Sequence, residues 1–220
     1  FVALNDGSCA QNLQVVVDFE NTDPSIIDRI KFGAAIGARG TLLESQGYFG
    51  TGLNEIVRVS GAPKGVLYYY FPEGKEQLAA EAIEQSAQLL AMHMRQELGS
   101  AAGAEAAVEA LRSFMLHLAD HVEAGGCRVG APIAAVSLEI AGASERLAAA
   151  CSNAYLLLQS VVAARLEQGG WQSDKAASLA TFVIATLEGG IVLTRAQRSA
   201  DPIRTCAEHM CALLAASTPD

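Results

Sequence analysis

The chain has 220 residues, of which 51% are hydrophobic and 6% aromatic, and its formal net charge at pH 7 is −9. This apolar content suffices for one large core or two small ones, and the abundance of Ala, Leu and Glu favours helices. The negative charge argues against a protein that coats nucleic acid without sequence preference. Uninterrupted apolar stretches fall short of the roughly 20 residues that a membrane span needs, so no membrane partner is expected.

The cysteines and the start of the chain both bear on the cellular compartment. Five scattered cysteines, an odd number, argue against a secreted disulfide framework. The chain opens with "FVALNDGSC", which lacks the basic and then apolar pattern of a secretory leader. These features predict a cytoplasmic protein.

The first 46 residues differ from the rest of the chain in their sequence pattern. Residues 1–28 carry an Asp-Gly turn signal and the β-branched run "LQVVVDF", which predict irregular structure or a short β-hairpin. Residues 29–46 place apolar side chains at helical spacing, although each of three interior glycines costs about 1 kcal/mol relative to alanine. We favour a helix that braces the next two helices. The alternative is strand-like backbone that leaves them poorly supported.

The stretch "TGLNEIVRVSGAPKGVLYYYF" predicts two short helices joined by a tight turn. Thr51 is placed to cap a first helix over residues 52–60, and Gly61 ends it. A second helix begins at Pro63 and stops before Pro72. This pattern is typical of a helix-turn-helix, whose second helix enters the major groove of DNA.

The three tyrosines at 68–70 fit that second helix. Consecutive helical residues fan out by about 100°, so one tyrosine faces inward with Val66 or Leu67 and the others point outward. An outward phenol can pack on deoxyribose and donate to phosphate, and Lys64 and Lys75 flank the surface as phosphate clamps. A hairpin, or a plain helical core with exposed tyrosine tips, is the alternative interpretation.

A series of long helices follows. In "ERLAAACSNAYLLLQSVVAARLEQ" the apolar residues recur every three or four positions, which predicts one buried helix face. The segment "SDKAASLATFVIATLEGGIVLTRAQ" is apolar almost all round its middle, as in a core or a subunit interface. The predicted helices cover residues 75–98, 104–124, 131–142, 144–168, 173–198 and 201–216.

Three pieces of the sequence, "GYFGTGLNEI", "SGAPKGVLYYYF" and "GKEQLAAEAI", together resemble the DNA-binding region of TetR/AcrR-type transcriptional repressors. The best-matching branch reads Pro-Lys-Gly-Ser-Leu-Tyr-Tyr-His-Phe-Pro in its recognition helix. This chain has Val66 in place of that serine, which removes a small hydroxyl, and Tyr70 in place of that histidine, which keeps an aromatic donor. The resemblance covers roughly residues 41–216.

The resemblance implies an all-α protein that binds a palindromic DNA operator as a homodimer and is not an enzyme. It divides the chain into an atypical N-terminal extension (1–28), a helix-turn-helix domain (29–83) and a helical ligand-binding and dimerisation domain (84–220). The helices near 144–168 and 173–198 would form a pocket and the dimer interface. The DNA-contact positions it implies are Thr51, Ala62, Pro63, Lys64, Gly65, Tyr68, Tyr69, Tyr70 and Lys75.

The candidate ligand pocket is apolar, which predicts a small apolar or aromatic effector. Its residues are Phe114, Met115, Leu118, Cys127, Tyr155 and Trp171. Cys127 lies beside Arg128 and is either an oxidant sensor or, as we favour, a buried filler. No cofactor and no metal site are predicted, because "CAEHMC" lacks a fourth ligand and His117 and His121 are better explained as pocket or surface residues.

The N-terminal segment has a second resemblance. "LNDGSCAQNLQVVVD" and "GAAIGARGTLLESQG" are similar to part of the anticodon-binding OB fold of asparaginyl-tRNA synthetases. About 45 residues cannot supply five barrel strands, so anticodon recognition is not expected, and a fusion near residues 41–47 is the simplest explanation. The alternative function is therefore a helical small-molecule-binding dimer whose sequence-specific DNA binding is impaired by the atypical N-terminus.

Overall fold

The computed structural model describes residues 42–61, 63–127, 132–140 and 142–217. The predictions for residues 1–28 and for the start of the bracing helix, residues 29–41, lie outside this part of the chain. The described residues fold into the helices α2 Leu42–Gly50, α3 Leu53–Ser60, α4 Lys64–Tyr70, α5 Lys75–Leu98, α6 Ala104–Ala124, α7 Pro132–Glu139, α8 Glu145–Gln168, α9 Ser173–Gln197 and α10 Asp201–Ala216.

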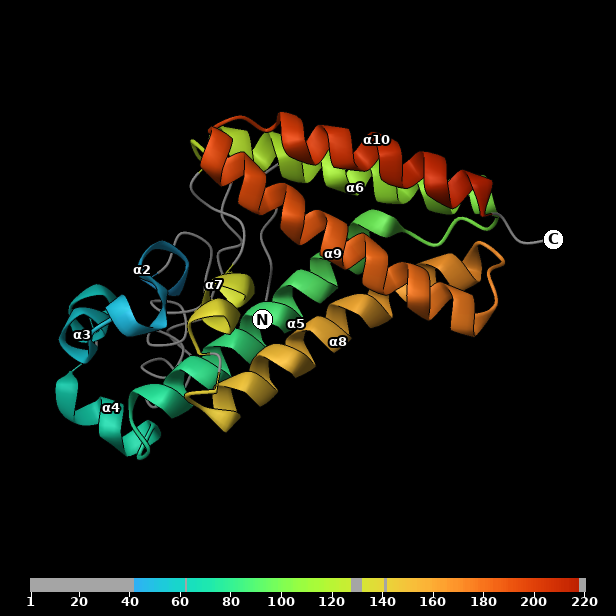
Figure 1. Ribbon diagram of the computed structural model, residues 1–220. Helices are drawn as coiled ribbons and strands as arrows, with labels where there is room; N and C mark the ends of the chain where they lie inside the picture. Colours follow the sequence, from blue (N-terminus) through green and yellow to red (C-terminus); the bar gives the residue numbers. More distant parts are fainter. Residues whose placement is uncertain (1–41, 62, 128–131, 141, 218–220) are drawn as a thin grey trace, which may run out of the picture.

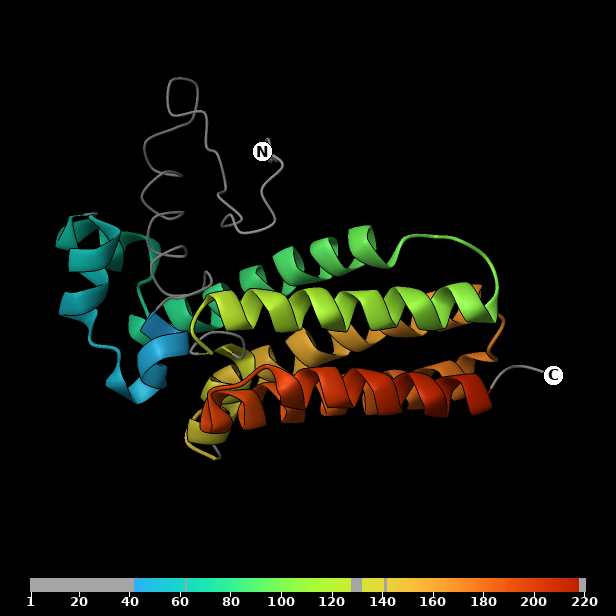
Figure 2. The ribbon, with the colours of Figure 1, turned by 90° about the horizontal axis from the view of Figure 1, so that it is seen from above.

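The helices form a small head and a long body (Figure 1). The head, residues 42–70, contains α2, α3 and α4, and the body contains α5 to α10. Within the body α5 packs along α8, α8 along α9, and α10 against both α6 and α9. Seen from above, α6 and α10 run side by side along the body, with the head at one end (Figure 2). The all-α prediction is confirmed for this fold.

Helical spacing of apolar residues explains the core of the body. On α8 the residues Leu147, Cys151, Leu158 and Leu166 are buried, as their spacing predicted, while Tyr155 is only partly buried. On α5 a stripe of small residues, including Ala87 and Ala91, lets α8 approach closely. The predicted bounds of α5, α6 and α10 agree with the structure.

The largest difference from the predicted helices is α7, which ends at Glu139 rather than near residue 142. The chain turns here, because the Ala143 N–H donates to the Ile140 carbonyl (2.6 Å) and Gly142 adopts a left-handed φ of 86°. Ser144 then caps α8 by accepting a hydrogen bond from the Leu147 N–H (3.1 Å). The turn therefore separates α7 cleanly from α8.

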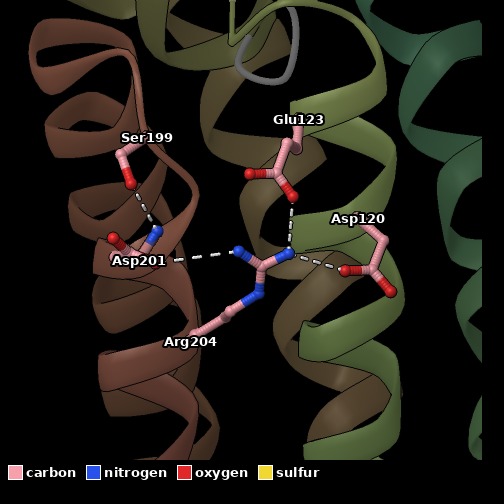
Figure 3. A network of polar contacts seen from close by, with 5 residues as sticks. All are labelled: Asp120, Glu123, Ser199, Asp201 and Arg204. Carbon is pink, nitrogen blue, oxygen red and sulfur yellow. Dashed lines mark hydrogen bonds and ion pairs between the residues drawn. The ribbon is translucent and has the colours of Figure 1, made fainter.

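An arginine network ties α10 to the end of α6 (Figure 3). Arg204 Nη2 lies 2.8 Å from Asp120 Oδ1 and 2.7 Å from Glu123 Oε2, and Nη1 lies 3.7 Å from Asp201 Oδ1. Hydrogen bonds to Glu123 and Asp120 raise the pKa of the Arg204 guanidinium above its ordinary value. The Asp201 N–H, at the start of α10, donates to Ser199 Oγ in the preceding turn (3.2 Å).

Helix α9 has three faces with different surroundings. Gly190 lies against Ile203 and Cys206 of α10, Glu188 faces Tyr155 of α8, and Val183 and Ile184 are buried in the core. On the third side Phe182, Val192 and Leu193 are 39%, 50% and 48% exposed. By length and composition α8 and α9 could each cross a membrane, but here both pack as bundle helices.

Candidate nucleic-acid interface

The second helix of the predicted helix-turn-helix, α4, is held to the rest of the protein by its inner side. Leu67 and Phe71 are 1% exposed, and Ile56 on α3 is fully buried. Gly61 joins the two helices with φ 67°, and its N–H donates to the Val57 carbonyl (3.1 Å). The left-handed conformation at this turn suits glycine. The predicted pair of short helices is therefore present.

The outer side of α4 carries the tyrosines. Tyr68 is 50% exposed and Tyr69 is 78% exposed, whereas Tyr70 packs partly against the core. The rings of Tyr69 and Tyr70 meet edge to face with centroids 4.9 Å apart. The three side chains thus fan out, and it is Leu67 with Phe71 that faces inward. The two exposed phenol groups are free to meet a nucleic-acid backbone.

The start of α4 combines a cation with little steric bulk. Lys64 is exposed, and its ammonium donates to Asn54 Oδ1 on α3 (3.0 Å). Pro63 precedes the helix as its N-cap, and a side chain added at Gly65 would meet no atom within 4 Å. Ala62 lies outside the described residues. Asn54, which orients Lys64, was missed from the sequence because the contact spans two helices.

Thr51 has a different local role from the predicted cap. The N-cap of α3 is Gly52, without a side-chain hydrogen bond, and Thr51 is fully buried. Its hydroxyl donates backward to the Gly47 carbonyl (2.6 Å). This bond satisfies a carbonyl at a kink in α2, where Gly47 adopts φ 71° and ψ −178°. The side chain of Thr51 is therefore not exposed at the surface, where the predicted DNA contact would form.

Lys75 starts α5 at the junction of head and body. Its ammonium lies 4.2 Å from the centroid of the Tyr48 ring, a cation–π contact with α2. Burial lowers the pKa of Lys75, and the nearby carboxylate of Glu139 opposes that shift. Lys75 is thus held at the junction, whereas Lys64 lies at the surface beside the exposed tyrosines.

The acidic residues near α4 have cationic partners of their own. Glu73, in the turn before α5, forms a 2.6 Å ion pair with Arg146 of α8, and that hydrogen bond lowers the pKa of Glu73. Glu55 lies 3.6 Å from Arg58 and accepts a hydrogen bond from Gln46 (3.1 Å). Pairing of these carboxylates reduces the repulsion that a phosphate backbone would meet.

Lys64→Ala is expected to weaken DNA binding for all sequences by a similar factor. If the ammonium neutralises one phosphate, the slope of log K against log[salt] becomes shallower by about one unit. Binding isotherms at several salt concentrations measure this slope. Lys175→Ala, an exposed lysine at the start of α9, is the matched control and should leave the slope as in the wild type. An unchanged slope for Lys64→Ala would contradict the phosphate contact.

The residues of the predicted ligand pocket fall into two regions. Phe114, Met115 and Leu118 lie on α6, where the first two are buried and the third packs against the core. Cys127 is buried just after α6, with a left-handed φ of 57°. Trp171 lies in the α8–α9 corner, and its indole N–H donates to the Ser217 carbonyl (2.7 Å). Trp171 therefore joins the α8–α9 corner to the end of α10.

A polar pair crosses from α8 to α9 inside the body. The Tyr155 hydroxyl donates to Glu188 Oε1 (3.1 Å), while Glu188 Oε2 is buried without a partner among the described residues. Burial raises the pKa of both groups, and for Tyr155 the neighbouring carboxylate adds to the shift. Glu188 was missed from the sequence, although it is the only charged residue between Lys175 and Arg195.

Glu188→Gln is expected to stabilise the fold at neutral pH by about 1–3 kcal/mol, because it replaces a buried carboxylate charge with a neutral amide that costs less to bury. Because the folded-state pKa of Glu188 is raised, the native state binds more protons, and stability falls as pH rises above the ordinary carboxyl pKa. The advantage of the variant should therefore vanish in acid. Denaturation at several pH values measures it, with Glu84→Gln, an exposed site on α5, as control. A pH-independent difference would contradict this assignment.

The candidate metal ligands do not converge. Within the described part of the chain no group of three His, Cys, Asp or Glu side chains is arranged to hold a metal ion. Cys211 donates weakly to the Val108 carbonyl (3.9 Å), and His209 is exposed. His117 Nδ1 lies 3.4 Å from Glu97, which also pairs with His93 at 2.7 Å.

Comparison with solved structures identifies the fold. NemR from Escherichia coli in its reduced form aligns with a TM-score of 0.71 at 19% identity, covering 83% of this chain and 95% of that one. A TetR regulatory protein from Rhodobacter sphaeroides also gives 0.71, at 20% identity, covering 86% and 98%. Separately, a 47-residue stretch, 21% of this chain, is 51% identical to asparagine–tRNA ligase of Porphyromonas gingivalis and covers 10% of that enzyme.

Sequence comparison identifies the family. Residues 41–82 match bacterial regulatory proteins of the tetR family, and residues 107–209 match the LmrA/YxaF-like C-terminal domain of transcriptional regulators. The regulator LmrA of Bacillus subtilis is 36% identical over 169 residues, 76% of this chain and 88% of LmrA, and the uncharacterised YxaF of the same species is 33% identical over 77% and 87%. These relatives are regulators, which confirms the prediction that the protein is not an enzyme. The chain belongs to the TetR family of bacterial transcriptional regulators.

Proposed function

We propose that the protein is a ligand-responsive repressor that acts in the cytoplasm and binds a palindromic DNA operator as a homodimer. The observation that carries the DNA-binding part is the two-sided α4. Leu67 and Phe71 anchor it from within, while Lys64, Tyr68 and Tyr69 are exposed on its outer side. A short helix held in this way can enter a major groove, with the phenols and the ammonium on the phosphate backbone.

The open face of α9 supports the homodimer. Phe182, Val192 and Leu193 are exposed there, and a side chain added at the exposed Gly189 would meet no atom within 4 Å. The helix's one charge between its ends, Glu188, is turned inward to Tyr155. An exposed face without charges, with a glycine that permits close approach, suits a two-fold interface between identical chains. The exposed Leu213 on α10 would extend it.

The body interior supports a small-molecule effector. The Tyr155–Glu188 pair between α8 and α9 supplies a phenol and a carboxylate oxygen that has no partner among the described residues, and Phe114 and Met115 are buried apolar residues of α6. We infer an apolar or aromatic effector with one polar group that satisfies Glu188 or Tyr155. An effector that binds one arrangement of the dimer more tightly shifts the population toward that arrangement. If the two heads are then no longer separated by roughly 34–36 Å, the two α4 helices cannot enter successive major grooves.

Selection from a random pool of DNA duplexes tests the proposal. Purified protein should enrich a palindrome whose half-sites are about one helical turn apart. A folded dimer that enriches no sequence would favour the alternative function, a helical small-molecule-binding dimer with impaired DNA reading. Neither function includes anticodon recognition by the stretch similar to asparagine–tRNA ligase, since 47 residues cannot build a five-stranded OB barrel.

A further inference from the structure

Helix α2 of the head contains a kink at Gly47. Gly47 breaks the helix with φ 71° and ψ −178°, so backbone groups around it lose their helical partners. Two of these groups find partners from elsewhere. The Gly47 carbonyl accepts from the Thr51 hydroxyl (2.6 Å), and the Phe49 N–H donates to Glu139 Oε2 (2.9 Å). The first partner belongs to the head, whereas the second belongs to α7 of the body.

The exposed carboxylate of Glu139 lies directly against the backbone of Gly47. A Cβ atom at Gly47 would lie 1.6 Å from Glu139 Oε1 and 2.8 Å from Oε2, so the carboxylate rests against the bare backbone of the kink. The helix that carries Glu139 is anchored in the core by Ile133 and Val136, and Ile140 follows it as a buried residue. Figure 1 shows α7 lying beside α2, as their packing requires. Glu139 therefore reaches the head from a fixed point in the body.

Two further polar contacts near the head join the start of α5 to the start of α8. Arg146 of α8 pairs with Glu73 (2.6 Å), and the Ser144 hydroxyl donates to Glu76 (2.5 Å). These contacts fix where α5 begins, but they do not contact α2. The Glu139 contact does, and its charge also acts on Lys75, whose ammonium sits over the Tyr48 ring of α2.

We propose that Glu139 is a positioning residue for DNA reading: its carboxylate completes the backbone hydrogen bonding at the α2 kink and so fixes the angle between head and body. The inference rests on the proposed DNA-binding function. In a dimer joined through the body, the angle of each head sets the separation of the two α4 helices, and specific binding requires both to meet a major groove. Non-specific binding, which depends on phosphate charge, does not require that match.

The experiment uses three variants of the full chain. Glu139→Ala removes the acceptor and the charge, Glu139→Gln keeps an acceptor oxygen for the Phe49 N–H, and Glu84→Ala removes an exposed glutamate of α5 as the matched control. Amide hydrogen exchange is measured at Phe49 by NMR. Affinities are measured for the duplex that the wild type selects and for a scrambled duplex.

Glu139→Ala should expose the Phe49 amide to rapid exchange and lower the affinity for the selected duplex by about tenfold, within the usual range of coupling between sites. Its affinity for scrambled DNA should stay the same or rise slightly, because Lys75 loses its nearby carboxylate. Glu139→Gln should retain both the protection and most of the specificity. The control should match the wild type.

Three results would overturn the proposal and leave the function standing. They are wild-type discrimination between the two duplexes by Glu139→Ala, equal losses of affinity for both duplexes, and a Phe49 amide that stays protected in this variant. If the wild type selects no duplex, the proposed DNA-binding function is wrong. The wild-type result alone therefore distinguishes failure of that function from failure of the Glu139 proposal.

Discussion

Replacing Phe182 with glutamate is expected to separate the homodimer into monomers and to lower the affinity for a palindromic operator on the order of 100-fold or more. Phe182 lies on the open face of α9, where it is 39% exposed in the single chain. In the proposed interface the new carboxylate would be buried without a partner, which is strongly unfavourable. A monomer also loses the gain in DNA affinity that comes from linking two heads, commonly a factor of 10²–10⁴.

Sedimentation velocity measures the association state, and a competition assay measures the operator affinity. Met92→Glu is the matched control, because Met92 is a 50% exposed apolar residue on α5 rather than on α9. It should remain dimeric. A Phe182→Glu protein that stays dimeric with wild-type operator affinity would show that the chains associate through another face.

Phe71→Ala is expected to lower the free energy of unfolding by about 3–5 kcal/mol, the usual cost of removing a buried aromatic side chain. Phe71 is the C-cap of α4 and is 1% exposed, and its N–H donates to the Leu67 carbonyl (2.8 Å). Without it the inner side of α4 loses its anchor, so sequence-specific DNA binding should fall to the level of a scrambled duplex. Body helices α6, α9 and α10 pack on one another and should keep the dimer intact.

Chemical denaturation gives the stability change for Phe71→Ala, and sedimentation checks that the dimer persists. Phe49→Ala is the control within the head, since Phe49 is 61% exposed and its side chain should contribute less than about 1 kcal/mol. If Phe71→Ala bound the operator as tightly as the wild type, burial of Phe71 would not be required to position α4 for DNA binding.

Much of the helical body was predictable from local pattern. Local signals explain why α5, α6 and α10 have their predicted bounds: glycines flank α5 and α6, and Pro202 lies in the first turn of α10. Leu147, Leu158 and Leu166 on α8 are buried as their spacing predicted. The turn at Gly61 was equally predictable from the sequence, since a glycine at the end of a short helix favours the left-handed conformation.

The parts that sequence reasoning missed depend on contacts between distant residues. Glu139 meets the α2 kink at a separation of 90 residues, and nothing near Gly47 indicates that its missing side chain accommodates a carboxylate from α7. The Tyr155–Glu188 pair spans 33 residues and two helices. Thr51 was interpreted as a forward cap because threonine before a helix usually caps it, whereas the kink behind it supplies a carbonyl that the hydroxyl bonds instead.

The net charge of −9 does not conflict with the proposed DNA binding. An acidic chain can present a DNA-reading surface where Lys64 lies beside two exposed phenols and the neighbouring Glu55 and Glu73 are paired with arginines. The charge that matters is local to α4 rather than summed over the chain. A body that is acidic overall would also disfavour binding away from a matched site, which sharpens discrimination.

The most direct test of a dimer that reads a palindrome is a competition titration at two salt concentrations. The competitors are the selected palindrome, a duplex with a single half-site, and a scrambled duplex. The proposed function predicts that the palindrome competes at least about 10³-fold better than the scrambled duplex, that the half-site lies between them, and that this order survives at the higher salt. Equal competition by all three duplexes, or a preference that disappears at the higher salt, would contradict it.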